Sequence, residues 1–197
     1  MEQSIPALVQ GAGDRFGDAS AVEDGDIRLS FRELAESGLR AGRAFRAAGL
    51  KAGDRAAIWA PNYYEWILAA IGLQSAGGVL VPLNTRLKAG EAAYVLQNSG
   101  AKMLCTVSDF LGVDYATEIR KQDVPALERV ITFRGHSDGA ETWEDFLAGG
   151  SAVAAETIQA QIAAIGPDDL SDILFTSGTT GKPKGVMTAH GQNMRAF

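Results

Sequence analysis

Apolar and polar positions alternate in blocks along most of the chain. Short runs of consecutive apolar residues indicate strands buried on both faces, and longer segments with helical spacing separate them. The predicted strands cover residues 55–60, 79–83, 102–107 and 129–133, and the predicted helices cover 30–48, 63–77, 88–100 and 108–122. This alternation predicts an α/β fold with an open, mostly parallel sheet flanked by helices.

Capping signals support some of these boundaries. Ser30 and Glu33 have the spacing of a capping box, which predicts a helix start at this point. Thr142 followed by Asp145 predicts the cap of a further short helix. The pattern then predicts a helix or ordered linker, two strands and a helix start over residues 151–165, 172–177, 185–190 and 191–197.

One uncharged stretch, Trp66 to Leu83, approaches the length of a membrane span. The sequence QSAGG interrupts it, and the VLVPL that follows has the composition of a strand. We therefore interpret the stretch as a buried helix followed by a buried strand, with no transmembrane segment.

Composition narrows the functional classes. With 197 residues, 46% of them apolar and 21% charged, the chain has globular composition and the size of one large domain or part of one. A formal charge of -6 argues against nucleic acid as the main partner. Cys105 is the single cysteine, so no disulfide within the chain is possible. We expect it to be a buried strand residue rather than a nucleophile. With no signal peptide recognised, a reducing, cytoplasmic location fits best.

The segment TSGTTGKPKG, residues 176–185, combines three glycines with hydroxyl side chains and two lysines directly after an apolar run. Glycines let backbone N–H groups converge on an anion, and hydroxyls add donors that rotate to fit. Lysine adds a point charge, and proline stiffens the loop. The composition therefore predicts a polyphosphate-binding loop, with side-chain donors from Thr176, Ser177, Thr179, Thr180 and Lys184.

This loop is not a Walker A motif. Only two residues separate Gly178 from the GK pair, where the Walker A motif has four, and Pro183 stands where it has Ser or Thr. A strand, rather than a helix, is predicted to follow. We therefore expect a loop over the phosphates and not a helix N-terminus beneath them.

The longer segment FTSGTTGKPKGV resembles the signature loop of the adenylate-forming superfamily, which includes acyl-CoA synthetases, luciferases and peptide-synthetase adenylation domains. Every defined position of the signature is met, and Lys182 occupies the free one. Residues 29–87 are also similar to the family's N-terminal half. The resemblance implies that residues 1–197 are the N-terminal portion of an AMP-binding (adenylation) domain, within the large N-terminal domain of such an enzyme.

The resemblance also implies a reaction. A small-molecule carboxylic acid attacks the α-phosphate of ATP to give an acyl-adenylate and pyrophosphate, and the thiol of CoA then displaces AMP. The loop would hold the β- and γ-phosphates, with Mg²⁺ near its first hydroxyls, and Lys184 would act catalytically by neutralising charge on the departing pyrophosphate. The implied ATP-binding residues are Thr176, Ser177, Gly178, Thr179, Thr180, Gly181, Lys184 and Gly185.

Several family positions have no counterpart in these 197 residues. They include the groups that contact adenine, ribose and metal, and a C-terminal catalytic lysine. We therefore expect a truncated chain that is inactive alone, and we assign no metal ligand. Two alternatives stay open, namely a non-catalytic protein that binds nucleotide or a partner, and the adenylation domain of a peptide synthetase.

Other candidate sites have simpler explanations. The sequence GAGDRFG at 11–17 has the wrong spacing for a dinucleotide fingerprint and predicts a helix end with a turn. His190 is a candidate for substrate contact or for a structural role at a helix start. Three aspartates are conceivable metal ligands, but PDDLSD is more typical of a turn leading into a strand; they are Asp168, Asp169 and Asp172.

Four aromatic residues precede or lie within the second predicted helix. Their rings suit either the wall of an acyl pocket or core packing, and core packing is the default for the tryptophans. These residues are Trp59, Tyr63, Tyr64 and Trp66.

Overall fold

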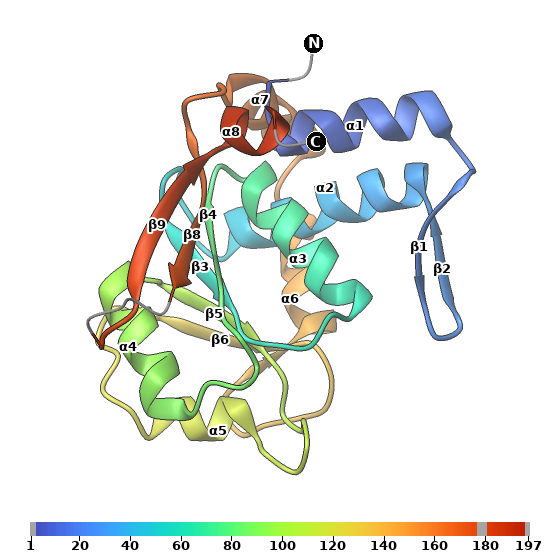
Figure 1. The fold of residues 1–197 in the computed structure, drawn as a ribbon. Helices are drawn as coiled ribbons and strands as arrows, with labels where there is room; N and C mark the ends of the chain where they lie inside the picture. The colour runs from blue at the N-terminus through green and yellow to red at the C-terminus, as the bar shows by residue number, and fades with distance from the viewer. Residues whose placement is uncertain (1–2, 177–180, 196–197) are drawn as a thin grey trace.

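A seven-stranded sheet carries the fold, with strand order β7-β6-β5-β3-β4-β8-β9 (Figure 1). The computed structural model describes residues 3–176 and 181–195. All neighbouring strands in this sheet are parallel except β9, which is antiparallel to β8. The predicted open, mostly parallel sheet is therefore confirmed. The strands are β3 (Arg55–Ile58), β4 (Val79–Pro82), β5 (Met103–Thr106), β6 (Arg129–Thr132), β7 (Glu141–Thr142), β8 (Leu170–Thr176) and β9 (Lys184–Ala189).

Helices cover both faces of the sheet. Helices α4 and α5 pack together on one face, and α2 and α3 pack together on the other, with α1, α6 and α7 around them (Figure 1). Their bounds are α1 (Ile5–Phe16), α2 (Phe31–Ala47), α3 (Tyr64–Ser75), α4 (Ala89–Ser99), α5 (Tyr115–Arg120), α6 (Trp143–Gly149), α7 (Ala155–Ala164) and α8 (His190–Arg195), with a short 3₁₀ turn at Gly150–Ala152.

A two-stranded hairpin, β1 (Ser20–Asp24) and β2 (Ile27–Ser30), lies outside the main sheet. The apolar pattern did not predict it, because both strands are short and neither contains a buried residue. The hairpin leads directly into α2, so its last residue also serves as the helix cap.

The predicted caps are present. The Ser30 hydroxyl accepts a hydrogen bond from the Glu33 backbone N–H at 3.2 Å, and the Glu33 carboxylate accepts one from the Ser30 N–H at 2.8 Å. The Thr142 hydroxyl accepts from the Asp145 N–H and begins α6. GAGDRFG is the end of α1, which stops at Gly17 with φ of 51°.

The prediction of a helix over residues 108–122 is wrong for the first half of that range. Leu111 and Gly112 both have positive φ, 55° and 76°, and form a tight turn bridged by Phe110 and Val113. The Asp114 carboxylate accepts from the Thr117 N–H and caps α5, so the helix begins only at Tyr115. A strong local cap thus outweighed the helical spacing of the apolar residues.

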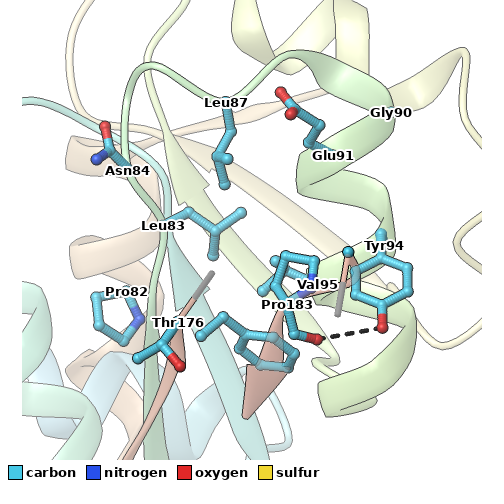
Figure 2. A pocket seen from close by; sticks show the side chains of 12 residues that line it. Pro82, Leu83, Asn84, Leu87, Gly90, Glu91, Tyr94, Val95, Thr176 and Pro183 are labelled. Atoms are coloured by element: carbon cyan, nitrogen blue, oxygen red, sulfur yellow. Dashed lines mark hydrogen bonds between the residues drawn. The ribbon is translucent and has the colours of Figure 1, made fainter. Parts of the chain in front are cut away.

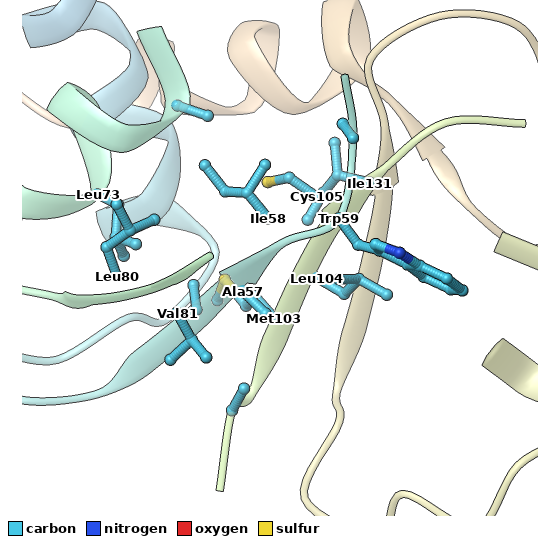
Figure 3. Packing of buried hydrophobic residues seen from close by; sticks show 14 of the residues in the cluster. Ala57, Ile58, Trp59, Leu73, Leu80, Val81, Met103, Leu104, Cys105 and Ile131 are labelled. Carbon is cyan, nitrogen blue, oxygen red and sulfur yellow. The ribbon is translucent and has the colours of Figure 1, made fainter. Parts of the chain in front are cut away.

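The core lies on both sides of β3, which pairs with β4 on one edge and β5 on the other (Figure 3). Cys105 is fully buried in β5, and burial raises the pKa of its thiol, so the expected structural role is confirmed.

The uncharged stretch 66–83 forms most of α3 followed by β4, both packed inside the domain. Within the described residues, no helix has the length and apolar character of a membrane span.

Arg134, just after β6, joins three separate parts of the chain. Its guanidinium makes two 2.9 Å hydrogen bonds to the Glu65 carboxylate in α3 and a third to Asp24 in the hairpin. Its cationic carbon lies 3.7 Å from the centre of the Tyr63 ring. Asp24 also accepts from the Tyr64 N–H at 3.0 Å, and this bond and Arg134 lower the pKa of the Asp24 carboxyl. The cluster therefore fixes the start of α3.

Replacing Arg134 should destabilise the fold measurably. Glu65 is only 4% exposed, so Arg134→Ala leaves a buried carboxylate without its cation, and we expect a loss of about 3 kcal/mol in the free energy of unfolding. Urea unfolding followed by circular dichroism measures this. The matched control is Arg129→Ala, which removes a more exposed ion pair with Glu141 and should cost less than about 1 kcal/mol. Equal losses in the two variants would contradict the role given to Arg134.

Candidate functional site

The signature segment begins at the end of β8 and ends at the start of β9. Thr176 ends β8 and Lys184 begins β9, and the two residues are direct cross-strand partners. The ends of the segment are therefore side by side at the carboxyl end of β8. Four of the predicted phosphate-binding residues lie outside the described residues: Ser177, Gly178, Thr179 and Thr180.

A strand follows the loop, as the sequence predicted, and not a helix. Gly181 has φ of 107°, a conformation that side chains rarely adopt. A Cβ on Gly185 would lie 3.0 Å from Ile173 and 3.2 Å from the Phe175 ring. Glycine is therefore favoured at both positions for local structural reasons. Gly181 needs its backbone angle, and Gly185 packs closely against β8.

A cavity of about 790 Å³ opens beside the loop, between the hairpin and α4 (Figure 2). It lies at the carboxyl ends of β4 and β8, the edge where open parallel sheets bind ligands. The wall is mainly apolar, with a few polar groups from Asn84, Glu91 and the Thr176 hydroxyl. Its lining residues are Pro82, Leu83, Asn84, Leu87, Gly90, Glu91, Tyr94, Val95, Phe175, Thr176, Gly181 and Pro183.

Helix α4 contacts the second arm of the loop, residues 181–184. The Tyr94 hydroxyl donates a hydrogen bond to the Pro183 carbonyl at 3.2 Å (Figure 2), and the Lys182 ammonium lies 5.7 Å from the centre of the Tyr94 ring. The sequence alone did not indicate Tyr94, because helical spacing identifies a partly buried face but not the distant segment that packs on it.

His190 does not join the loop. It lies at the far end of β9 from Lys184 and is buried, and its Nδ1 accepts from the Ile5 N–H at 3.3 Å. That contact satisfies a donor at the start of α1, so the structural alternative for His190 is supported. Burial lowers the pKa of the imidazole, against the opposing charges of Asp169 and Asp172.

The candidate aspartates make internal hydrogen bonds. Asp169 accepts from the Gly166 N–H at 2.8 Å and forms the predicted turn before β8. Asp172 accepts from Ser171 and Asn193, both at 2.7 Å. Among the described residues, no group of three or more His, Cys, Asp or Glu side chains is placed to hold a metal ion.

The aromatic residues mostly pack inside the domain. Trp59 is 1% exposed, stacks on Tyr115 with centroids 4.1 Å apart, and donates from Nε1 to the Asn84 carbonyl at 3.2 Å. Tyr63 lies under Arg134, and Trp66 packs against the core. None of the four lines the cavity beside the loop.

Comparison with known protein families identifies the family of this chain. Residues 9–197 match the family described as AMP-binding enzyme. This match extends over nearly the whole chain and includes the loop, so the chain belongs to the AMP-binding enzyme family. The resemblance inferred from the signature is thereby confirmed.

Several curated relatives are named as CoA ligases. The chain is 38% identical over 97% of its length to "3-[(3aS,4S,7aS)-7a-methyl-1,5-dioxo-octahydro-1H-inden-4-yl]propanoyl:CoA ligase" of Rhodococcus jostii (strain RHA1). It is 32% identical over 95% of its length to crotonobetaine/carnitine–CoA ligase of Salmonella paratyphi A. The chain spans 38% and 37% of the length of these two relatives.

Solved structures share the fold. The N-terminal domain of FACL13 from Mycobacterium tuberculosis is 26% identical, with a TM-score of 0.78 over 95% of this chain and 44% of that one. The anthranilate CoA ligase AuaEII, in complex with anthranoyl-AMP, gives a TM-score of 0.81 at 23% identity, over 96% of this chain and 35% of that one. These likenesses support the architecture described above.

The buried His190 should make the stability of the chain depend on pH. Its pKa is below the ordinary 6.5 in the folded state, so the unfolded state binds the proton more readily. Its contribution is complete above about pH 6.5 and falls as the pH drops towards the folded-state pKa. We expect the urea midpoint to decrease between pH 7.5 and pH 5.5, and to decrease less in His190→Asn.

The chain offers a matched control in its other histidine. The His136 side chain is 74% exposed, so His136→Asn replaces the other imidazole without removing a buried contact and is the comparison variant. Carboxyl groups with lowered pKa titrate well below this pH window and do not obscure the comparison. An identical pH response in the parent and in His190→Asn would contradict the assignment.

Proposed function

We propose that the chain is the phosphate-binding portion of an ATP-dependent ligase that joins a carboxylic acid to CoA through an acyl-adenylate. The observation that carries the proposal is the complete TSGTTGKPKG signature, whose ends pair between β8 and β9 at the carboxyl edge of a parallel sheet. Membership of the AMP-binding family and relatives named as CoA ligases support it. In this proposal residues 1–197 are the N-terminal portion of the adenylation domain.

The chemistry explains why such a loop is needed. A carboxylate has no adequate leaving group, so attack of its oxygen on the α-phosphate of ATP forms an acyl-adenylate and releases pyrophosphate. The CoA thiol then displaces AMP and forms the thioester. Negative charge builds on the departing pyrophosphate, and fixed donors aimed at that charge lower the barrier.

We assign the donors to residues 176–185. Lys184 carries the positive charge for the β- and γ-phosphates and is the proposed catalytic residue. Hydroxyls and backbone N–H groups would supply the remaining contacts, from Thr176, Ser177, Gly178, Thr179, Thr180, Gly181 and Gly185. The exposure of Lys184 and its position opposite Thr176 support this role.

ATP would enter as its Mg²⁺ complex. The described residues offer no cluster of acidic side chains for a resident metal. Mg²⁺ commonly keeps several waters and binds through substrate phosphates, and a hydroxyl such as that of Thr176 suits such a partly hydrated ion. A cytoplasmic location belongs to the same proposal, since ATP and CoA are available there and a lone cysteine fits a reducing compartment.

The acid remains to be identified by a screen. Two relatives that are 38% and 39% identical carry the name of a dioxo-octahydroindenyl propanoate ligase, so this bicyclic propanoate is the first acid to test. Carnitine, crotonobetaine and medium-chain fatty acids follow, from the names of other relatives. Acid-dependent exchange of labelled pyrophosphate into ATP, by a full-length ligase that carries this chain, is the direct assay.

Lys184→Ala should slow adenylation in that ligase. Removing one charged donor from the leaving pyrophosphate should reduce the exchange rate by about 10²-fold, with little change in the binding of the acid. Exchange at saturating ATP and acid, with acid affinity measured separately, gives the two quantities. The control is Lys121→Ala, a lysine at the end of α5 whose ion pair with Glu118 is exposed. Unchanged exchange in Lys184→Ala would refute the assignment.

The 197-residue chain by itself should form no detectable acyl-CoA. It spans under two fifths of the length of the two CoA ligases compared above, and the groups that contact adenine, ribose and metal and the catalytic lysine are expected elsewhere. A thioester assay with ATP, CoA and the acid panel tests this expectation. Turnover by the pure chain with any of these acids would overturn it.

A further inference from the structure

Helix α4 offers a rigid support beside the phosphate loop. Its inner face is buried through Ala92, Val95 and Leu96. At its start the Glu91 carboxylate accepts from the Lys88 N–H at 2.8 Å, and at its end Gly100 adopts a left-handed cap. The helix backbone in the middle of α4 is therefore held independently of the loop.

Tyr94 stands at this position and contacts two consecutive loop residues. Its hydroxyl donates to the Pro183 carbonyl (Figure 2). Its ring lies below the Lys182 ammonium, 5.7 Å from the ring centre. A hydrogen bond and a cation–π contact thus converge on one partly buried side chain. Lys182 occupies the position that the signature leaves free, and in this chain the contact gives it a local partner.

The hydrogen bond between Tyr94 and Pro183 restrains the orientation of the peptide that precedes Lys184. The Pro183 carbonyl belongs to the peptide plane that connects Pro183 to Lys184, and proline also fixes its own φ. On the other side, Lys184 pairs with Thr176 in the hairpin ladder. The Tyr94 hydrogen bond therefore restrains the peptide before Lys184, and the pairing with Thr176 restrains Lys184 itself.

We propose that Tyr94 is a positioning residue that anchors the second arm of the phosphate loop, and that it aligns Lys184 for the pyrophosphate of ATP. The kinetic part of this inference rests on the proposed function. Tyr94 does not itself touch the reacting atoms. Its effect comes from reducing the conformations that Lys184 must lose when the nucleotide binds.

The anchoring can be tested on the chain without any ligand. Tyr94→Phe keeps the ring and removes the hydroxyl, so the fold should remain intact. We expect amide hydrogen exchange in a peptide spanning 181–187 to become about two- to tenfold faster, as expected for the loss of one hydrogen bond. Tyr115→Phe is the matched control, since it removes a 2.7 Å tyrosine-to-carbonyl bond to Thr85 that does not involve the loop.

A second measurement separates positioning from general stability. In a full-length ligase that carries this chain, Tyr94→Phe should raise the KM for ATP several-fold, with the KM for the acid and the Tm unchanged. Unchanged exchange in 181–187, or an unchanged KM for ATP, would overturn the proposal. If the ligase fails to adenylate any acid, the proposed function fails, but the exchange comparison still decides whether Tyr94 anchors the loop.

Discussion

The parallel pairing of β8 with β4 is the constraint on which the rest of the site depends. The two strands are far apart in sequence, and the chain crosses the sheet through α4, α5, α6 and α7 before β8 returns to the edge of β4. The buried Gln74 side chain at the end of α3 donates to the Ser171 carbonyl at 3.1 Å and helps to hold β8 in place. Because the strands are parallel, their carboxyl ends meet at one edge. The cavity and the start of the signature loop lie there together for that reason.

Local signals explain why much of this architecture was predictable. Strands such as β3 and β5 are short apolar runs because helices cover both of their faces, and α2 begins at a capping box that is visible as Ser30 and Glu33. The prediction failed where local and distant effects compete. The turn at Leu111 needs a positive φ that nothing in the residue type announces, and the β1–β2 hairpin is held partly by Asp24 and its distant partner Arg134. Such long-range ion pairs leave no periodic trace in a sequence.

The candidate site, like the fold, could be predicted only in part from the sequence. A phosphate-binding role for the signature segment could be proposed from the sequence, because a hydroxyl-rich, glycine-rich segment with two lysines has few other chemical uses. The walls of the cavity could not be predicted from the sequence, since Leu83, Leu87 and Phe175 have the same apolar character as residues of the core. Tyr94 was missed for a related reason. A tyrosine on a partly buried helix face packs against something, but only the folded structure identifies the partner as Pro183.

A hairpin loop and a helix N-terminus solve the problem of phosphate binding with different physical means. In a Walker A site the helix dipole and its free N–H groups are fixed beneath the anion. A loop between two antiparallel strands has no such dipole, so its charge must come from side chains and its order from contacts with neighbouring elements. The ladder between β8 and β9, from the Leu170–Ala189 pair to the Thr176–Lys184 pair, supplies order along the hairpin, and α4 supplies it from the side. The ability of such a loop to adjust around a changing phosphate therefore depends on how firmly its second arm is held.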